Sequence, residues 1–258
     1  MLPAAALFTG SVLFSEVRRR HNRGDSSDTA VVDGKIHSSH ENPSIQGISR
    51  REAHAPLCSH VGIVEARKNV MLPNASPYVQ MLNGDDWNFC LFPHFKGALT
   101  YVMKQCHEGI SGDGNHKGPR NELKSKVPVP GNWQLRSDIM DSAIYTNIKY
   151  IIPINPPHVP TQNPTGVYYR TFKSSQNWTV QSDDESQYSS TNRRVFLHFA
   201  GVDSCFYLYL NGQLVGFSKD SRLPAEFDVR RDTLLCSNMS MLCNMSSDIA
   251  FHLFVLHS

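Results

Sequence analysis

The sequence lacks any long hydrophobic run. None of its 258 residues lies in a segment that approaches the ~20 apolar residues of a membrane-spanning helix, so we expect no membrane partner. No charge of one sign prevails: 25 basic and 23 acidic residues give a formal net charge of +2. This balance gives no general reason to expect nucleic acid as a partner. Internal repeats and long helix-period patterns are also absent, which favours strands over helices.

The common catalytic and metal-binding motifs are missing as well. Gly112-Asp-Gly114 begins like a dinucleotide fingerprint, but Lys117 stands where a glycine is required. Residues 109–113 fail as a nucleophile elbow because their last position is Asp. His107-Glu108 lacks the second His of the zinc helix motif, and the 12 His residues are scattered without ligand spacing. These patterns assign no catalytic residue.

The six cysteines show no regular spacing. Cys90 and Cys205 lie inside apolar, strand-like runs. We interpret them as buried free thiols in a reducing compartment rather than as a disulfide framework. The cytoplasm is therefore the expected location.

Length sets an upper limit on what the chain can hold. The hydrophobic share of 40% and the 13 Phe, 9 Tyr and 3 Trp suffice for a sizeable core. A (β/α)8 barrel needs about 250 residues by itself. The chain therefore cannot contain such a barrel together with another domain of any size.

Alternation of apolar and polar residues predicts several short strands. The predicted strands run over residues 87–92, 144–152, 167–172 and 194–200. Residues 104–126 and 174–192 are polar and are expected to form exposed loops. Residues 63–69 form a short helix at most.

The clearest local signal is Asn211-Gly212, which stands between the alternating apolar runs 205–210 and 213–217. Both turn residues tolerate the positive φ angle that a type I′ hairpin turn requires. Short strands, turn residues between them and 15 prolines together predict an all-β sandwich.

Two polar constellations are candidates for a site. Asn163 opens the segment NPTG, whose Asn, Pro and Gly suit a type I turn. Asp220 follows a predicted strand and stands next to Arg222 in a polar loop. From the residues alone, Asn163 is a turn former and Asp220 an ion-pair partner of Arg222, unless the two side chains line a pocket.

Further motifs occur in order along the chain. They cover residues 127–134 (VPVPGNWQ), 144–147 (IYTN), 155–157 (NPP), 160–166 (PTQNPTG), 210–216 (LNGQLVG) and 220–228 (DSRLPAEFD). Together they closely resemble the N-terminal sugar-binding domain of the large bacterial-type β-galactosidases of glycoside hydrolase family 2. Upstream, residues 41–43, 47–50 and 52–56 resemble the family's N-terminal lead segment, in which Trp usually stands where this chain has His40. The resemblance covers about residues 41–233.

The resemblance implies a jelly-roll β-sandwich (galactose-binding-domain-like) that packs on a catalytic (β/α)8 barrel. By motif match, Asn163 and Asp220 correspond to residues of the family's galactose pocket, and Asp220 to one that helps to hold sodium. A carboxylate accepts hydrogen bonds from sugar hydroxyls and is a hard ligand for a cation. The resemblance thus implies a β-galactoside sugar and a barrel domain as partners. Sodium and magnesium are implied for the full-length enzyme, with an incomplete sodium site and no other cofactor in this chain.

The chain departs from the family where catalysis is concerned. Retaining glycosidases use two carboxylates about 5–5.5 Å apart, and in this family both are Glu residues on barrel strands. Glu122 follows an Asn, as the family's acid/base does, but it lies in a polar loop and is interpreted as coincidence. Beyond Thr233 the match fades. We therefore expect a chain truncated before the barrel and inactive alone, although the family is one of β-galactoside hydrolases.

These observations predict four regions. Residues 1–40 are a disordered arm, residues 41–76 an extended lead segment, and residues 77–233 the jelly-roll domain. Residues 234–258 form an irregular, divergent tail, with a candidate substitute strand over 250–256. Two alternative functions stay open: a stand-alone carbohydrate-binding module, and a docking partner of a separate barrel-bearing chain.

Overall fold

The computed structural model describes residues 12–18, 36–55, 57–69, 72–108, 124–139, 141, 155–172, 193–220, 223–229 and 249–256. The predicted strand 144–152, the predicted loop 174–192, Glu122 and Arg222 lie outside the described residues.

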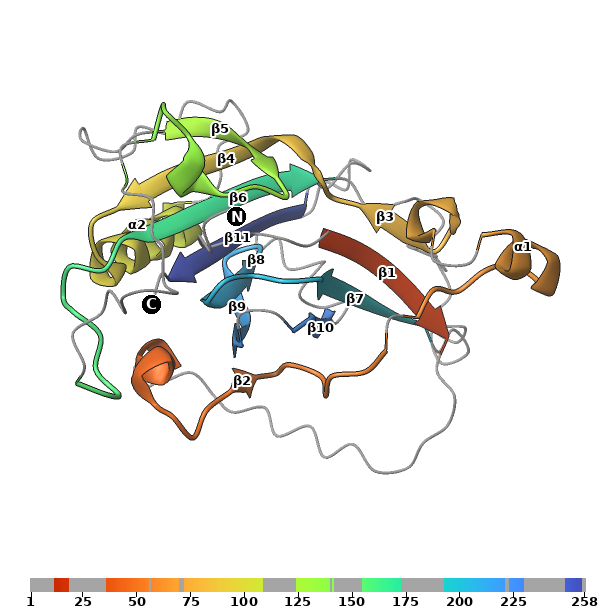
Figure 1. The fold of residues 1–258 in the computed structure, drawn as a ribbon, viewed down its shortest axis with the longest axis horizontal. Coiled ribbons are helices and arrows are strands. Elements are labelled where there is room, and N and C mark those ends of the chain that lie inside the picture. Colours follow the sequence, from red (N-terminus) through yellow and green to blue (C-terminus); the bar gives the residue numbers. More distant parts are fainter. Residues whose placement is uncertain are drawn as a thin grey trace, which may run out of the picture.

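Two antiparallel sheets form the fold (Figure 1). The larger sheet has the strand order β2 (Gly47–Ile48), β9 (Gln213–Lys219), β8 (Cys205–Leu210), β11 (Ile249–Leu256), β6 (Thr165–Phe172), β4 (Gly84–Phe92) and β5 (Lys124–Val129). The smaller sheet has the order β10 (Ala225–Val229), β7 (Arg193–Phe199), β1 (Val12–Arg18) and β3 (Val79–Met81). The helices are α1 (Ile63–Lys68) and α2 (Phe95–Glu108), with 3-10 turns η1 (Ile36–Glu41), η2 (Pro73–Ala75) and η3 (Trp133–Leu135). The predicted all-β sandwich is confirmed.

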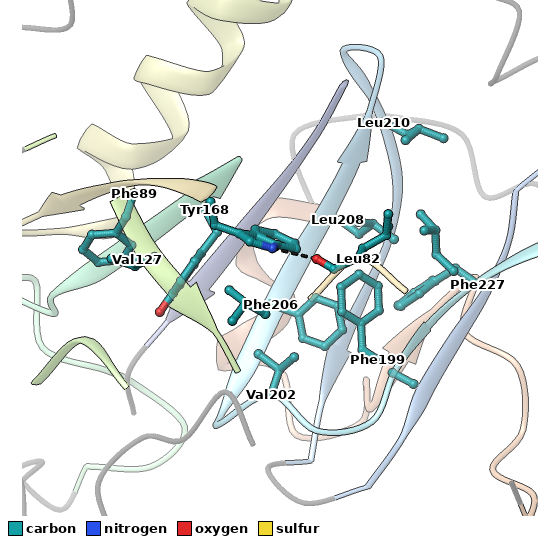
Figure 2. Packing of buried hydrophobic residues seen from close by; sticks show 14 of the residues in the cluster. Leu82, Phe89, Val127, Tyr168, Phe199, Val202, Phe206, Leu208, Leu210 and Phe227 are labelled. Carbon is teal, nitrogen blue, oxygen red and sulfur yellow. Dashed lines mark hydrogen bonds between the residues drawn. The ribbon is translucent and has the colours of Figure 1, made fainter. Parts of the chain in front are cut away.

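The main hydrophobic core lies between the two sheets. The four-stranded sheet supplies Leu197, Phe199 and Phe227, and the seven-stranded sheet supplies aromatic and aliphatic side chains opposite them. Figure 2 shows this packing, with Phe199, Phe206 and Phe227 in one aromatic group. The dashed line in Figure 2 is the hydrogen bond from the Trp87 indole N–H to the Leu82 carbonyl oxygen, at 2.8 Å. The indole is therefore buried with its polar group satisfied, as burial requires.

A second hydrophobic cluster covers the outer face of the seven-stranded sheet. Strand β8 is buried on both faces: Phe206, Leu208 and Leu210 enter the main core, and Tyr207 and Tyr209 enter this second cluster. Helix α2 covers the second cluster, which explains why every residue of β8 is apolar or aromatic. Side chains that point alternately to two buried faces require such a run.

Helix α2 was not expected from the sequence, which predicted an exposed loop over residues 104–126. Residues 104–108 are not part of an exposed loop but end this helix, and residues 124–126 already belong to β5. The reason is the spacing of Ala98, Tyr101 and Val102, which are buried at positions i, i+3 and i+4 and pack on the sheet. The short helix expected over 63–69 is confirmed by α1.

Within the arm that was expected to be disordered, one described segment forms a strand. Residues 12–18 form β1, which pairs with both β3 and β7. Without β1, the facing main-chain groups of β3 and β7 would be unpaired edges, which explains why a strand forms there. In the predicted tail, the candidate strand 250–256 coincides with β11, which lies between β8 and β6.

The hairpin prediction is confirmed. Asn211 has a φ of 47° and Gly212 a φ of 81°, the positive values that a type I′ turn requires. Cys90 and Cys205 are buried free thiols, also as predicted, and burial raises the pKa of the Cys205 thiol to about 12. The described residues include no helix long and apolar enough to cross a membrane.

Candidate functional site

One row of paired residues crosses the seven-stranded sheet near one end. Thr165 pairs with Phe92 on one side and with Leu256 on the other. Leu256 in turn pairs with Cys205, and Cys205 with Lys219. The starts of β6 and β8 and the ends of β4, β9 and β11 therefore meet at this end, which we call the rim.

Both predicted site residues lie at the rim. Asn163 stands two residues before β6, and Asp220 directly follows β9. From β6 to β9 there are three strand spacings, so the two main chains are about 14 Å apart. The two side chains therefore share one end of the sheet but do not contact each other, and a ligand would meet them at different points.

Asn163 is buried, with 6% of its surface exposed. Its carbonyl oxygen accepts a hydrogen bond from Thr165 Oγ1 at 2.9 Å, but its side-chain Nδ2 has no partner among the described residues. A buried donor without an acceptor costs about 1–3 kcal/mol. The type I turn predicted over 163–166 does not form, because Thr165 and Gly166 already belong to β6.

Asp220 is exposed, and its main chain is held in an unusual conformation. Its φ of 123° lies in a region that non-glycine residues rarely adopt. Its N–H donates to the Ser204 carbonyl oxygen at 3.2 Å, and its carbonyl oxygen accepts from the Leu223 N–H at 3.3 Å. The main chain is thus fixed while the carboxylate faces solvent, an arrangement often found at functional sites.

A partly buried ionic cluster holds the lead segment on the sandwich. The Glu226 carboxylate accepts from Arg51 Nη1 and His54 Nε2, each at 2.8 Å, and pairs with His198 Nδ1 at 2.9 Å. Burial by itself would raise the Glu226 pKa, but the hydrogen bonds from His198 and His54 outweigh burial and lower the pKa to about 2. Both ring nitrogens of His54 face oxygens, since Nδ1 lies 2.8 Å from the Ala55 carbonyl. Hydrogen bonds to Ala55 and Glu226 raise the pKa of His54.

Comparison with known proteins identifies the family of the chain. The family model for the sugar binding domain of glycosyl hydrolases family 2 matches residues 79–243, which include Asn163 and Asp220. This chain belongs to glycosyl hydrolase family 2. A beta-galactosidase of Pectobacterium atrosepticum is 38% identical over 191 residues, which are 74% of this chain and 15% of that protein. A beta-galactosidase of Yersinia pestis is 41% identical over 189 residues, or 73% of this chain and 15% of that protein.

The family 2 chain spans about 15% of the length of the curated relatives that it matches. Among solved structures, a beta-glucuronidase of an uncultured Clostridium species is similar over 67% of this chain and 21% of its own, with a TM-score of 0.34 and 18% identity. Likeness at that level is too low for comparing residue positions.

The family 2 resemblance implies a sodium ion at Asp220, which would need further ligands beside this carboxylate. A hard cation takes several oxygen ligands in one place. Among the described residues, no three His, Cys, Asp or Glu side chains come together in a metal-binding arrangement. Among these residues, two further such side chains do not join Asp220, so a complete cation site there would need oxygen ligands from other groups.

The sequence motifs of this family 2 domain predict Asn163 and Asp220 as site residues but do not predict the partners of Glu226. His198 lies 28 residues before Glu226 in the sequence, and the two pair only because β7 and β10 are adjacent, with Glu226 opposite His198. No short-range pattern signals such a pair. The alternation of apolar residues in β7 and β10 predicts the pair of His198 and Glu226 only once the register of the two strands is known.

Proposed function

We propose that this chain supplies the sugar-contacting part of a β-galactoside-hydrolysing protein and binds a terminal β-galactoside at the rim. The observation that carries the proposal is the strand register, which sets Asn163 and Asp220 at the same end of the same sheet. The names of the relatives support galactose as the sugar.

The chemistry of the two side chains suits a sugar. The exposed Asp220 carboxylate accepts hydrogen bonds from hydroxyl groups, while the Asn163 amide both donates and accepts. The unpartnered Nδ2 of Asn163 gains an acceptor if a ligand or an adjoining domain rearranges its surroundings. A ligand hydroxyl at that position would remove the cost of the buried donor.

We also propose that the chain binds the sugar without hydrolysing it. A glycosidase general acid needs a raised pKa. Among the described residues, the pKa of Asp138 is lowered by its hydrogen bond with Arg136, and the pKa of Glu226 is lowered as well. Both shifts are opposite to that requirement. Sodium and magnesium would then belong to sites completed by other parts of the full-length protein. The free thiols of the described cysteines favour the cytoplasm as the location.

Calorimetric titration of the full chain with methyl β-galactoside tests the proposal. We expect saturable binding with a dissociation constant in the millimolar range, about −4 kcal/mol. Asp220→Asn and Asn163→Ala should each weaken binding at least about tenfold, equivalent to about 1.4 kcal/mol. Asp85→Asn, an exposed carboxylate outside the rim, is the matched control and should bind like wild type. No heat from the wild-type chain, or equal loss in the control, would refute the proposal.

A second function is docking onto a separate, barrel-bearing family 2 hydrolase. It is favoured by large apolar side chains on and beside α1, a helix with no buried residue that projects from the sandwich (Figure 1). The exposed side chains are Leu57, Val61, Ile63, Val64 and Leu72. Sedimentation of the chain with such a hydrolase should show a complex that Val64→Asp weakens. Separate sedimentation of the two proteins would count against docking.

A further inference from the structure

The turn His40–Asn42 contacts three separate parts of the rim. Its first residue, His40, contacts β8. The His40 N–H donates to Tyr207 Oη at 3.4 Å, and His40 Nδ1 lies 3.1 Å from the same oxygen. The His40 ring also packs edge-on against Phe95, with ring centroids 4.9 Å apart. Burial lowers the pKa of His40, which favours the neutral ring, and in the tautomer with hydrogen on Nε2 the Nδ1 atom accepts a hydrogen bond from the Tyr207 hydroxyl. The turn is thus anchored on the sheet.

Glu41 reaches the segment that leads to Asn163. Its Oε1 accepts a hydrogen bond from the Val159 N–H at 3.0 Å, and its Oε2 faces His158 Nδ1 at 3.8 Å. Val159 precedes Asn163 by four residues, within a stretch that is neither helix nor strand. A carboxylate that accepts from a main-chain N–H restricts the position of that main chain more strongly than a neutral acceptor would.

Asn42 reaches the segment that carries Asp220. Its carbonyl oxygen accepts from Lys219 Nζ at 2.6 Å, and Lys219 directly precedes Asp220. Shortly after the turn, the Gln46 carbonyl oxygen accepts from the Lys219 N–H at 3.0 Å, and Gly47 then pairs with Ser218 as β2 begins. The end of β9 is therefore tied to the turn through the Lys219 side chain, and to the residues that follow the turn through main-chain contacts.

We propose that Glu41 is a positioning residue that, from this turn, fixes the Asn163 loop relative to the Asp220 loop. The two loops are separated by about three strand spacings, and no hydrogen bond between them is needed because one three-residue turn contacts both. The proposal rests on the proposed function in one respect: the loops are positioned for a sugar. The restraint of residues 158–163 by Glu41 does not depend on whether a sugar binds.

Amide hydrogen exchange on the full chain tests the restraint without any sugar. Glu41→Ala removes the acceptor of the Val159 N–H, and we expect exchange at Val159 to rise about tenfold. Glu41→Gln keeps a neutral oxygen acceptor, so it should restore most of the slow exchange. Glu52→Ala, an exposed Glu of the same lead segment, is the matched control and should leave Val159 unchanged. Unchanged exchange in Glu41→Ala, or equally raised exchange in Glu41→Gln, would overturn the proposal.

The sugar titration supplies the second readout. If wild type binds methyl β-galactoside, Glu41→Ala should weaken binding several-fold, and Glu41→Gln should recover most of the affinity. Full affinity in Glu41→Ala would overturn the positioning role. If wild type binds no sugar, the function proposed above fails, while exchange at Val159 still decides whether Glu41 restrains the loop. Should Glu41→Ala fail to fold, Lys219→Met tests the contact between the turn and the Asp220 loop. We expect faster amide exchange at Asp220. Unchanged exchange would contradict a restraint of this loop by the turn.

Discussion

Replacing Glu226 with glutamine removes one negative charge from the midst of three basic side chains. The carboxylate lies 2.8–2.9 Å from nitrogens of Arg51, His54 and His198. Glutamine has nearly the same shape and keeps an oxygen acceptor, so the variant isolates the loss of charge from the loss of packing. We expect it to destabilise the fold and loosen the lead segment, which the cluster holds on β7 and β10.

The magnitude follows from the pKa of Glu226, which is lowered from 4.5 to about 2. Because a tenfold change in an acid dissociation constant is worth about 1.4 kcal/mol, this lowering corresponds to about 3 kcal/mol of folding free energy. The Arg51 side chain is 40% exposed and His54 32% exposed, so solvent screens part of the interaction. We therefore expect Glu226→Gln to cost about 2 kcal/mol near pH 6.

The loss should depend on pH in both directions. Since the Glu226 pKa is lower in the folded chain, its contribution is present above 4.5 and is lost as the pH falls towards 2. Since the pKa of His54 is raised above 6.5, its contribution is complete below 6.5 and is lost as the pH rises through the folded value. The difference between wild type and variant should therefore be greatest between about pH 5 and about pH 6.5.

Urea unfolding from about pH 3 to about pH 8 measures this difference as a free energy of unfolding. Glu52→Gln, an exposed carboxylate on the same segment, is the control and should change stability by less than about 0.5 kcal/mol at every pH. A loss in Glu226→Gln that stays constant over this range would refute the ionic account, as would an equal loss in the control.

Two further changes test the packing. Leu208 is fully buried, so Leu208→Ala should lower the free energy of unfolding by about 2–5 kcal/mol, whereas Leu57→Ala, at an 86% exposed residue, should change it by less than about 0.5 kcal/mol. Similar urea midpoints for the two variants would contradict the core assignment. Gly216→Ala would place a methyl group against the Ile48 carbonyl oxygen and the Phe227 ring, so we expect a loss of about 1–3 kcal/mol. Amide exchange should also quicken at Ile48, and wild-type protection there would show that β2 does not pack as described.

Much of the sandwich interior could be predicted because local pattern and final environment agree. The hairpin at Asn211-Gly212 has both the turn residues and the alternating flanks that its geometry needs. Helix α2 was missed because its apolar residues occupy only part of one face, and its polar residues dominate the composition of residues 104–108. Strand β1 was missed because its partners, β3 and β7, lie far from it in sequence.

The candidate site could be predicted residue by residue but not as a geometry. Asn163 and Asp220 stand in recognisable motifs, yet their common position at the rim depends on the register of four strands, including β11. The contacts of Glu41 join residues more than one hundred positions apart, as with Val159. Such contacts follow from topology, which short sequence patterns do not encode.

The proposed function requires a β-galactoside to bind at the rim. Mapping the main-chain amide resonances of the full chain during titration with methyl β-galactoside tests it most directly. We expect saturable shifts confined to the loops around Asn163 and Asp220 and to the adjoining ends of β6 and β9. Absence of shifts, or shifts confined to the opposite end of the sheet, would contradict it.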